Sequence, residues 1–221
     1  MKRIVLMGPP GAGKGTQAKR LAERYNMAHL SSGDILRARR GSGSELGRRL
    51  KTYMDAGELV PDEIVVEIMA RAIAAQGPES GLLLDGFPRT VPQAEALDGQ
   101  LAELDRPLEA VLVIDVPDEA VVERITGRRS CPRCGKVYHV AHLPPEVAGR
   151  CDACGAELVQ RDDDTEDVVR ERLAAYRGQT APVIAYYEAA GRAVLRVDGG
   201  GSPDEVTERI AEALGAPETA G

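Results

Sequence analysis

The residues of this 221-residue chain that most clearly could do chemistry form one glycine-rich segment near its start. The segment Gly8–Thr16, with the sequence GPPGAGKGT, follows an apolar run and precedes a helical pattern, which is the context that a phosphate-binding loop requires. Its glycines let backbone N–H groups turn inward, and the start of the helix adds a positive dipole end. Lys14 would reach the β- and γ-phosphates of a nucleoside triphosphate. The candidate binding residues are Gly11, Ala12, Gly13, Lys14, Gly15 and Thr16.

The position after Lys14 departs from the common form of this motif. Gly15 stands where Ser or Thr usually follows the lysine, and Thr16 comes next, so direct ligation of Mg²⁺ by a hydroxyl is not expected there. Asp85 ends the apolar run Leu82–Leu84 and would lie near the loop. Because Mg²⁺ gives up its water shell reluctantly, we expect Asp85 to hold the ion through water molecules.

Four cysteines form a second group with possible chemistry. They occur as two C-x-x-C pairs separated by sixteen residues, Cys131 with Cys134 and Cys151 with Cys154, and this spacing is typical of a Cys₄ zinc ribbon. Four thiolates fill a tetrahedral coordination sphere, so the predicted Zn²⁺ is structural. An unmetallated or disulfide-bonded cluster is the alternative. His139 and His142 are not needed as ligands; we expect His139 to face a nucleotide or the surface and His142 to lie at the surface.

The elements that must position these residues alternate between strands and helices. Apolar runs predict strands at 4–7, 82–84, 111–114 and 193–197, and helical patterns occupy roughly 14–25, 62–76, 91–104, 118–128, 165–190 and 203–214. This alternation predicts an α/β fold with a parallel sheet covered on both faces. Ligands bind such sheets beyond the carboxyl ends of the strands, where the glycine loop and Asp85 would lie.

Two segments do not fit the alternation. Residues 31–60 hold short helical patterns broken at Gly41–Gly43 and at Gly57, with no strand, and residues 127–164 are rich in Gly, Pro, Cys and His. We call them the first and the second insertion. Long excursions from a compact core are usually binding loops or lids. Both are suited to close over substrates and to exclude water, which would otherwise accept a phosphoryl group.

Composition and charge narrow the class of ligand. Hydrophobic residues make up 43% and charged residues 29% of the chain, and the net charge is −7, which weighs against general nucleic-acid binding. Arginines in several loops suit a small polyanion better. No run of about 18 apolar residues occurs, so no membrane association is expected. The apolar start is too short for a signal peptide, and a cytoplasmic location is expected.

Several motifs together resemble one known family. GPPGAGKGT, SSGDILR at 31–37, LLLDGFPRT-x-x-Q at 82–93, GRR at 127–129 and RDDD at 161–164 occur in the order and at the spacing found in adenylate kinases of the nucleoside monophosphate kinase family. The resemblance covers almost the whole chain, and the cysteines match the long-lid, zinc-binding type. It implies reversible transfer of the terminal phosphoryl group of MgATP to AMP, giving two ADP.

The resemblance also assigns roles by position. The AMP side would comprise Ser32, Arg37, Glu58, Leu59, Val60, Gly86, Phe87, Pro88, Arg89, Gln93, Arg161 and Arg172. The ATP side would add Arg124, Arg128, Val137, Tyr138 and Gly201 to the loop. The cations expected to align and neutralise the transferred group are Lys14, Arg89, Arg128, Arg161 and Arg172. Such positioning and charge neutralisation are what phosphoryl transfer needs.

The resemblance implies a three-layer P-loop fold with a five-stranded parallel sheet, divided into three parts. The core would comprise residues 1–30, 61–126 and 165–221, the AMP-binding insertion 31–60 and the zinc-binding lid 127–164. A protein with both lids on one chain needs no partner, so a monomer is expected. The alternatives are a kinase for UMP, CMP or GMP, a zinc-ribbon protein that binds nucleic acid, and a P-loop ATPase or GTPase switch.

Overall fold

The computed structural model describes residues 2–56 and 58–215, and its centre is a five-stranded parallel sheet. The strand order is β2 (Met27–Ser31), β3 (Gly81–Asp85), β1 (Arg3–Met7), β4 (Ala110–Asp115) and β7 (Ala193–Asp198). All neighbouring strands pair in parallel. The predicted α/β fold with a five-stranded parallel sheet is therefore confirmed.

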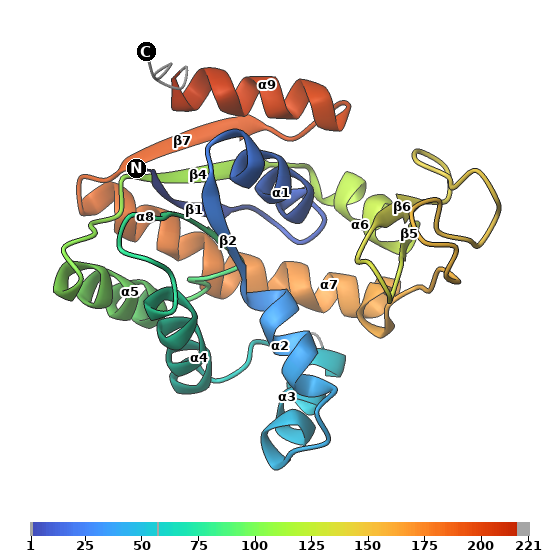
Figure 1. Ribbon diagram of the computed structural model, residues 1–221, viewed down its shortest axis with the longest axis horizontal. Coiled ribbons are helices and arrows are strands. Elements are labelled where there is room, and N and C mark those ends of the chain that lie inside the picture. Colours follow the sequence, from blue (N-terminus) through green and yellow to red (C-terminus); the bar gives the residue numbers. More distant parts are fainter. Residues whose placement is uncertain (1, 57, 216–221) are drawn as a thin grey trace.

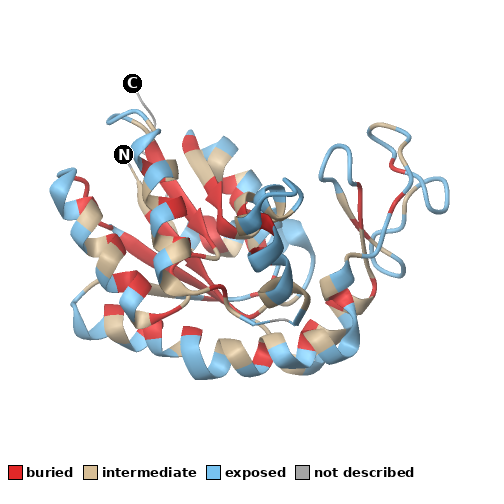
Figure 2. Ribbon diagram, turned by 90° about the horizontal axis from the view of Figure 1, so that it is seen from below, coloured by how far each residue is buried: buried red, intermediate tan, exposed pale blue. Residues whose placement is uncertain are grey.

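Helices cover both faces of this sheet (Figure 1). Because successive side chains of a strand point to opposite faces, Ile4 and Leu6 of β1 pack with α1 (Lys14–Arg24) and α9 (Pro203–Leu214). Val5 and Met7 pack on the other side, with α4 (Asp62–Ala74), α5 (Val91–Glu103) and α8 (Ala181–Ala189). The result is the expected three-layer arrangement, and Figure 2 shows the buried strands at its centre.

The strand β2 has no counterpart among the apolar runs that predicted the other four. Only Met27, Leu30 and Ser31 of its five residues are buried, and His29 interrupts the apolar sequence. As an edge strand, β2 pairs with β3 alone. Ser31 ends this strand, so the expectation that residues 31–60 contain no strand is wrong at its first residue.

The helical stretch predicted over 165–190 is divided in the structure. It consists of α7 (Glu166–Ala175), a π-helical turn over Tyr176–Thr180 and α8. Pro182 lies near the start of α8 and has no N–H to donate to a carbonyl one turn earlier. This missing donor is consistent with the wider, π-helical turn that precedes α8. The helix predicted over 118–128 is shorter, because α6 (Asp118–Thr126) ends before Arg128 enters a strand.

The two insertions lie outside the layered core in Figure 1. The first contains α2 (Ser32–Arg40) and α3 (Glu45–Ala56), separated at residues 41–44; the break expected at Gly57 lies outside the described residues. The second contains the antiparallel strands β5 (Arg128–Ser130) and β6 (Val137–His139) and the 3-10 helix Asp162–Asp164. Among the described residues, no helix has the length and apolar character needed to cross a membrane.

Candidate active site

The glycine loop connects β1 to α1 at the carboxyl edge of the sheet. Gly13 caps α1 in a left-handed conformation (φ 89°) without a side-chain cap, and the first turn carries no acidic residue. Its first amide groups are therefore suited to an anion. The Lys14 Nζ donates hydrogen bonds of 2.7 Å to the carbonyl oxygens of Gly8 and Pro9, which folds the side chain back over the loop.

Asp85 ends β3, the strand next to β1, in register with Leu6. Its side chain is almost buried, and His29 Nε2 lies 3.5 Å from its Oδ2. A Cβ built on Gly15 would lie 3.6 Å from the same carboxylate oxygen. The sheet thus brings Asp85 directly beside the glycine loop.

Several cations meet at this loop. Burial lowers the pKa of Lys14 to about 7; Arg89, Arg172 and Arg128 act in the same direction, and the charge of Asp85 opposes them. Burial likewise lowers the pKa of Arg172 to about 10. Arg161 is linked to this group through Arg37 and Arg128, and its pKa is also lowered to about 10, chiefly by burial. The charges of Arg89, Arg128 and Arg172 therefore act on Lys14, and Arg161 is joined to this group through Arg128.

A pocket adjoins this region between α2, α3, α4 and the end of β3. It is lined by nine residues of the predicted AMP side, namely Ser32, Arg37, Glu58, Leu59, Val60, Gly86, Arg89, Gln93 and Arg172. Phe87, Pro88 and Arg161 do not line it, and Phe87 is 2% exposed within the core. The lining is completed by five residues that were not predicted as site residues, Gly33, Leu36, Met54, Val65 and Asp163. Among these five residues, Leu36 and Met54 could have been predicted, because they are apolar positions of helical patterns.

The turn after β3 holds the polar side of this pocket in place. Ser32 Oγ and Arg89 Nε donate to the Gly86 carbonyl oxygen at 2.6 and 2.7 Å. Gly86 has φ +73°, and a Cβ there would lie 2.9 Å from Ser32 Oγ and 3.0 Å from Arg89 Nη2, so only glycine fits. Gln93 accepts from the Arg89 amide at 2.8 Å and donates to Asp62 at 2.7 Å. Asp62 is a supporting residue that no sequence motif indicated.

The tract Arg161–Asp164 supplies partners for two of the arginines. Asp164 is fully buried and accepts from Arg128 through both carboxylate oxygens, with Nε to Oδ2 at 2.9 Å. Asp163 accepts from Arg172 Nη1 at 2.9 Å. The tract therefore orients the guanidinium groups that reach the loop from the second insertion and from α7.

The remaining residues predicted for the ATP side lie in two places, at the β7–α9 connection and in the second insertion. Arg124 Nη2 donates to the Gly199 carbonyl oxygen at 3.0 Å, which joins α6 to the β7–α9 connection that contains Gly201. Val137 is half-buried in β6. The Tyr138 hydroxyl donates to Cys151 Sγ at 3.4 Å and accepts from the Asp152 amide at 2.8 Å. Tyr138 thus supports the cysteine cluster.

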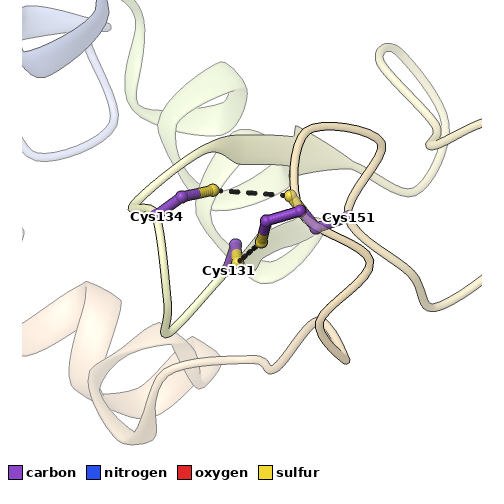
Figure 3. A group of neighbouring side chains, drawn as sticks. Cys131, Cys134 and Cys151 are labelled. Atoms are coloured by element: carbon purple, nitrogen blue, oxygen red, sulfur yellow. Dashed lines mark hydrogen bonds between the residues drawn. The ribbon is translucent and has the colours of Figure 1, made fainter.

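The four cysteines converge in the second insertion, and Figure 3 labels three of them, Cys131, Cys134 and Cys151. The four sulfur atoms lie within 4.8 Å of one another, with Cys131 3.4 Å from Cys154 and Cys134 3.5 Å from Cys151, and all four are free thiols. The hydrogen bond from Tyr138 lowers the pKa of the Cys151 thiol to about 6. Four sulfur donors at this separation are compatible with one tetrahedral metal ion.

The two histidines of the second insertion make their contacts with α6. His139 accepts the amides of Ala141 and His142 at Nδ1 and therefore carries its proton on Nε2, 3.2 Å from the Glu123 carbonyl oxygen. His142 Nε2 lies 2.9 Å from the Glu123 carboxylate, and the two rings stack. His142 is exposed, as expected, and His139 is half-buried against α6.

Comparisons with known proteins agree on one family. The sequence model of the family described as adenylate kinase matches residues 6–192. Proteins named adenylate kinase from Methanothrix thermoacetophila and Thermodesulfovibrio yellowstonii are 50% and 49% identical, over 96% of this chain and 97% and 98% of their own lengths. One from Archaeoglobus fulgidus is 52% identical over 89% of this chain and 90% of its own. With a match of this extent, the chain belongs to the adenylate kinase family.

Proposed function

We propose that this protein transfers the terminal phosphoryl group of MgATP reversibly to AMP, giving two ADP. The observation that carries the proposal is the position of Arg89. It lines the pocket between α2, α3 and α4, and its charge also acts on Lys14 of the glycine loop. A guanidinium between an acceptor pocket and a triphosphate loop is placed to contact both phosphate chains.

On the donor side, the loop residues Gly11–Thr16 would surround the phosphates of ATP, with Lys14 on the β- and γ-phosphates. Arg124 and Gly201 would border the base of ATP, with Val137 and Tyr138 beside them. Arg128 would neutralise charge on the transferred group, held in orientation by Asp164. These residues contribute alignment and electrostatic stabilisation, which are the main requirements of phosphoryl transfer.

On the acceptor side, the first insertion would close over AMP. The segment Glu58–Val60 and Gln93 would line the base, while Ser32, with Gly86 behind it, would fix its position. Arg37, Arg89 and Arg172 would bind the phosphate, because guanidinium groups match phosphate oxygens in pairs. Phe87 and Pro88 would act through the turn that carries Arg89. Arg161 would approach from the second insertion when it closes.

We propose Mg²⁺ and Zn²⁺ as the metal ions of this enzyme. Asp85 would hold Mg²⁺ through water beside the loop, and the ion would supply charge neutralisation on the phosphates. Cys131, Cys134, Cys151 and Cys154 would hold Zn²⁺ as a structural ion, since four thiolates leave no open position. The second insertion has few buried apolar residues of its own, so a metal would supply much of its stability.

We further propose the division into a core (1–30, 61–126 and 165–221), an AMP-binding insertion (31–60) and a lid (127–164). The first insertion would supply residues for AMP, the second would supply Arg128 for ATP and Arg161 for AMP, and the core bears the glycine loop and Asp85. Because one chain provides both sides of the site, the protein is expected to act as a monomer. Light scattering coupled to gel filtration measures this directly.

An assay of ADP formation from ATP and AMP tests the function. Wild-type protein should form two ADP for each ATP consumed, and Arg89→Ala should lose about 10²- to 10³-fold in kcat, the usual loss for one electrostatic stabiliser. Full activity in that variant would refute the mechanism. Parallel assays with UMP, CMP and GMP distinguish the other nucleoside monophosphate kinases. ATP hydrolysis without an acceptor would point to an ATPase instead.

A further inference from the structure

Arg40, the last residue of α2, contacts carboxylates of both insertions. Its Nη2 lies 2.8 Å from Asp55 Oδ1 in α3 and 2.8 Å from Asp162 Oδ2 in the 3-10 helix of the second insertion. The Arg40 side chain is 18% exposed. Lys51 also pairs with Asp55. Arg40 is therefore held from its own insertion by Asp55 and reaches across to the other insertion through Asp162.

The contact at Asp162 is significant because of its neighbours. Each of the three consecutive aspartates of this turn contacts an arginine: Asp162 binds Arg40, Asp163 binds Arg172, and Asp164 binds Arg128. Arg172 Nη1 also lies 3.9 Å from Asp164 Oδ1. The turn contains only these three residues, so a shift of Asp162 also moves the carboxylates of Asp163 and Asp164. A displacement of α2 would thereby be transmitted to Arg128 and Arg172.

From this geometry we infer that Arg40 is a positioning residue, which couples closure of the first insertion over the acceptor nucleotide to the alignment of Arg128 and Arg172 around the transferred phosphoryl group. The inference rests on the proposed function, because it assigns an acceptor to the first insertion and a donor to the loop. Arg40 itself does not line the acceptor pocket. It acts through Asp162 rather than on a substrate.

Coupling of this kind is measurable as the effect of one ligand on the affinity for the other, and it is reciprocal. The coupling factor is the ratio of the Kd of AMP alone to the Kd of AMP in the presence of the β,γ-imido analogue of ATP with Mg²⁺. Titration calorimetry measures both values. In the wild-type protein this factor should exceed one. In Arg40→Ala it should fall about two- to fivefold, the range that corresponds to a partly exposed ion pair.

A double-mutant cycle assigns the effect to the contact across the insertions. Asp162→Ala should lower the coupling factor as much as Arg40→Ala, and the double variant should lower it no further. Arg40→Lys, which keeps the charge, should restore most of it. Arg39→Ala is the matched control, because Arg39 is an exposed neighbour on the same helix and should leave the factor unchanged.

Two results would overturn the inference. One is a coupling factor in Arg40→Ala that equals the wild-type value. The other is a double variant in which the effects of the Arg40 and Asp162 substitutions on the coupling factor add. Neither result bears on the reaction itself, which the ADP assay with wild-type protein tests separately. If wild-type protein binds both nucleotides but forms no ADP, the proposed function fails, while the cycle still reports whether Arg40 couples the two sites.

Discussion

Replacing Asp164 by asparagine separates the charge of this side chain from its shape. Arg128 donates two hydrogen bonds to the fully buried carboxylate. Asparagine keeps one acceptor oxygen but turns an NH₂ group toward the second guanidinium donor. Removing one member of a buried ion pair costs about 3–5 kcal/mol. Because one acceptor remains, we expect the free energy of unfolding to fall by about 3 kcal/mol, which lowers Tm by about 6–12 °C for a domain of this size.

Urea unfolding and calorimetry measure this loss, and Asp162→Asn serves as the control. Asp162 belongs to the same turn, but its side chain is 75% exposed, so its substitution should change stability by less than about 0.5 kcal/mol. Asp164→Asn should also lower kcat/KM for ADP formation by up to about a hundredfold, because a misplaced catalytic group has that cost. Equal stabilities of the two variants would refute the assignment of Asp164 as the support of Arg128.

Four further measurements test the proposed site. First, the pKa of Lys14 is lowered to about 7, and bound phosphates should raise it. At pH 8, where Lys14 is mostly neutral in the free protein, binding of MgATP should therefore take up close to one proton. At pH 6, where Lys14 is already mostly protonated, it should take up almost none. Calorimetry in buffers of different ionisation enthalpy counts these protons, and equal uptake at both pH values would contradict the assignment. Second, Gly86→Ala should raise KM for AMP about 5- to 150-fold with little change for ATP, because its Cβ would lie 2.9 Å from Ser32 Oγ and an overpacked site costs about 1–3 kcal/mol. Equal effects on both nucleotides would argue against a specific acceptor role. Third, Cys151→Ser should lower the zinc content and Tm together, measured by metal analysis and calorimetry, whereas loss of zinc at constant Tm would exclude a structural metal. Fourth, rapid-quench kinetics should reveal a burst of ADP if opening of the insertions limits turnover, and a linear time course would contradict this.

The sequence was most informative where chemistry depends on local geometry. The glycine loop, Asp85 and the cysteine pairs are defined by short-range spacing, and the structure brings each group together. Residues that act through tertiary contacts carried no such signal. Asp62 supports Gln93 across 31 positions, and Arg40 meets Asp162 across 122. The hydrogen bond from Tyr138 to Cys151 also joins residues 13 positions apart, and the predicted contact of Tyr138 with ATP stays a prediction.

The distribution of carboxylates separates two classes of arginine in this site. Cations gathered around one point repel one another before any phosphate arrives, so each needs a partner. Arg128 is bound by Asp164, which is fully buried and does not line the pocket; exchange of this partner for phosphate would leave a buried carboxylate unpaired. Asp163 lines the pocket. Its burial favours a raised pKa, but Arg172, Arg37 and Arg128 outweigh it and hold the pKa of Asp163 below its usual value. We therefore expect Arg172, which also lies 3.9 Å from Asp164, to exchange Asp163 for an entering phosphate, whereas Arg128 should keep Asp164 as its partner and stay oriented.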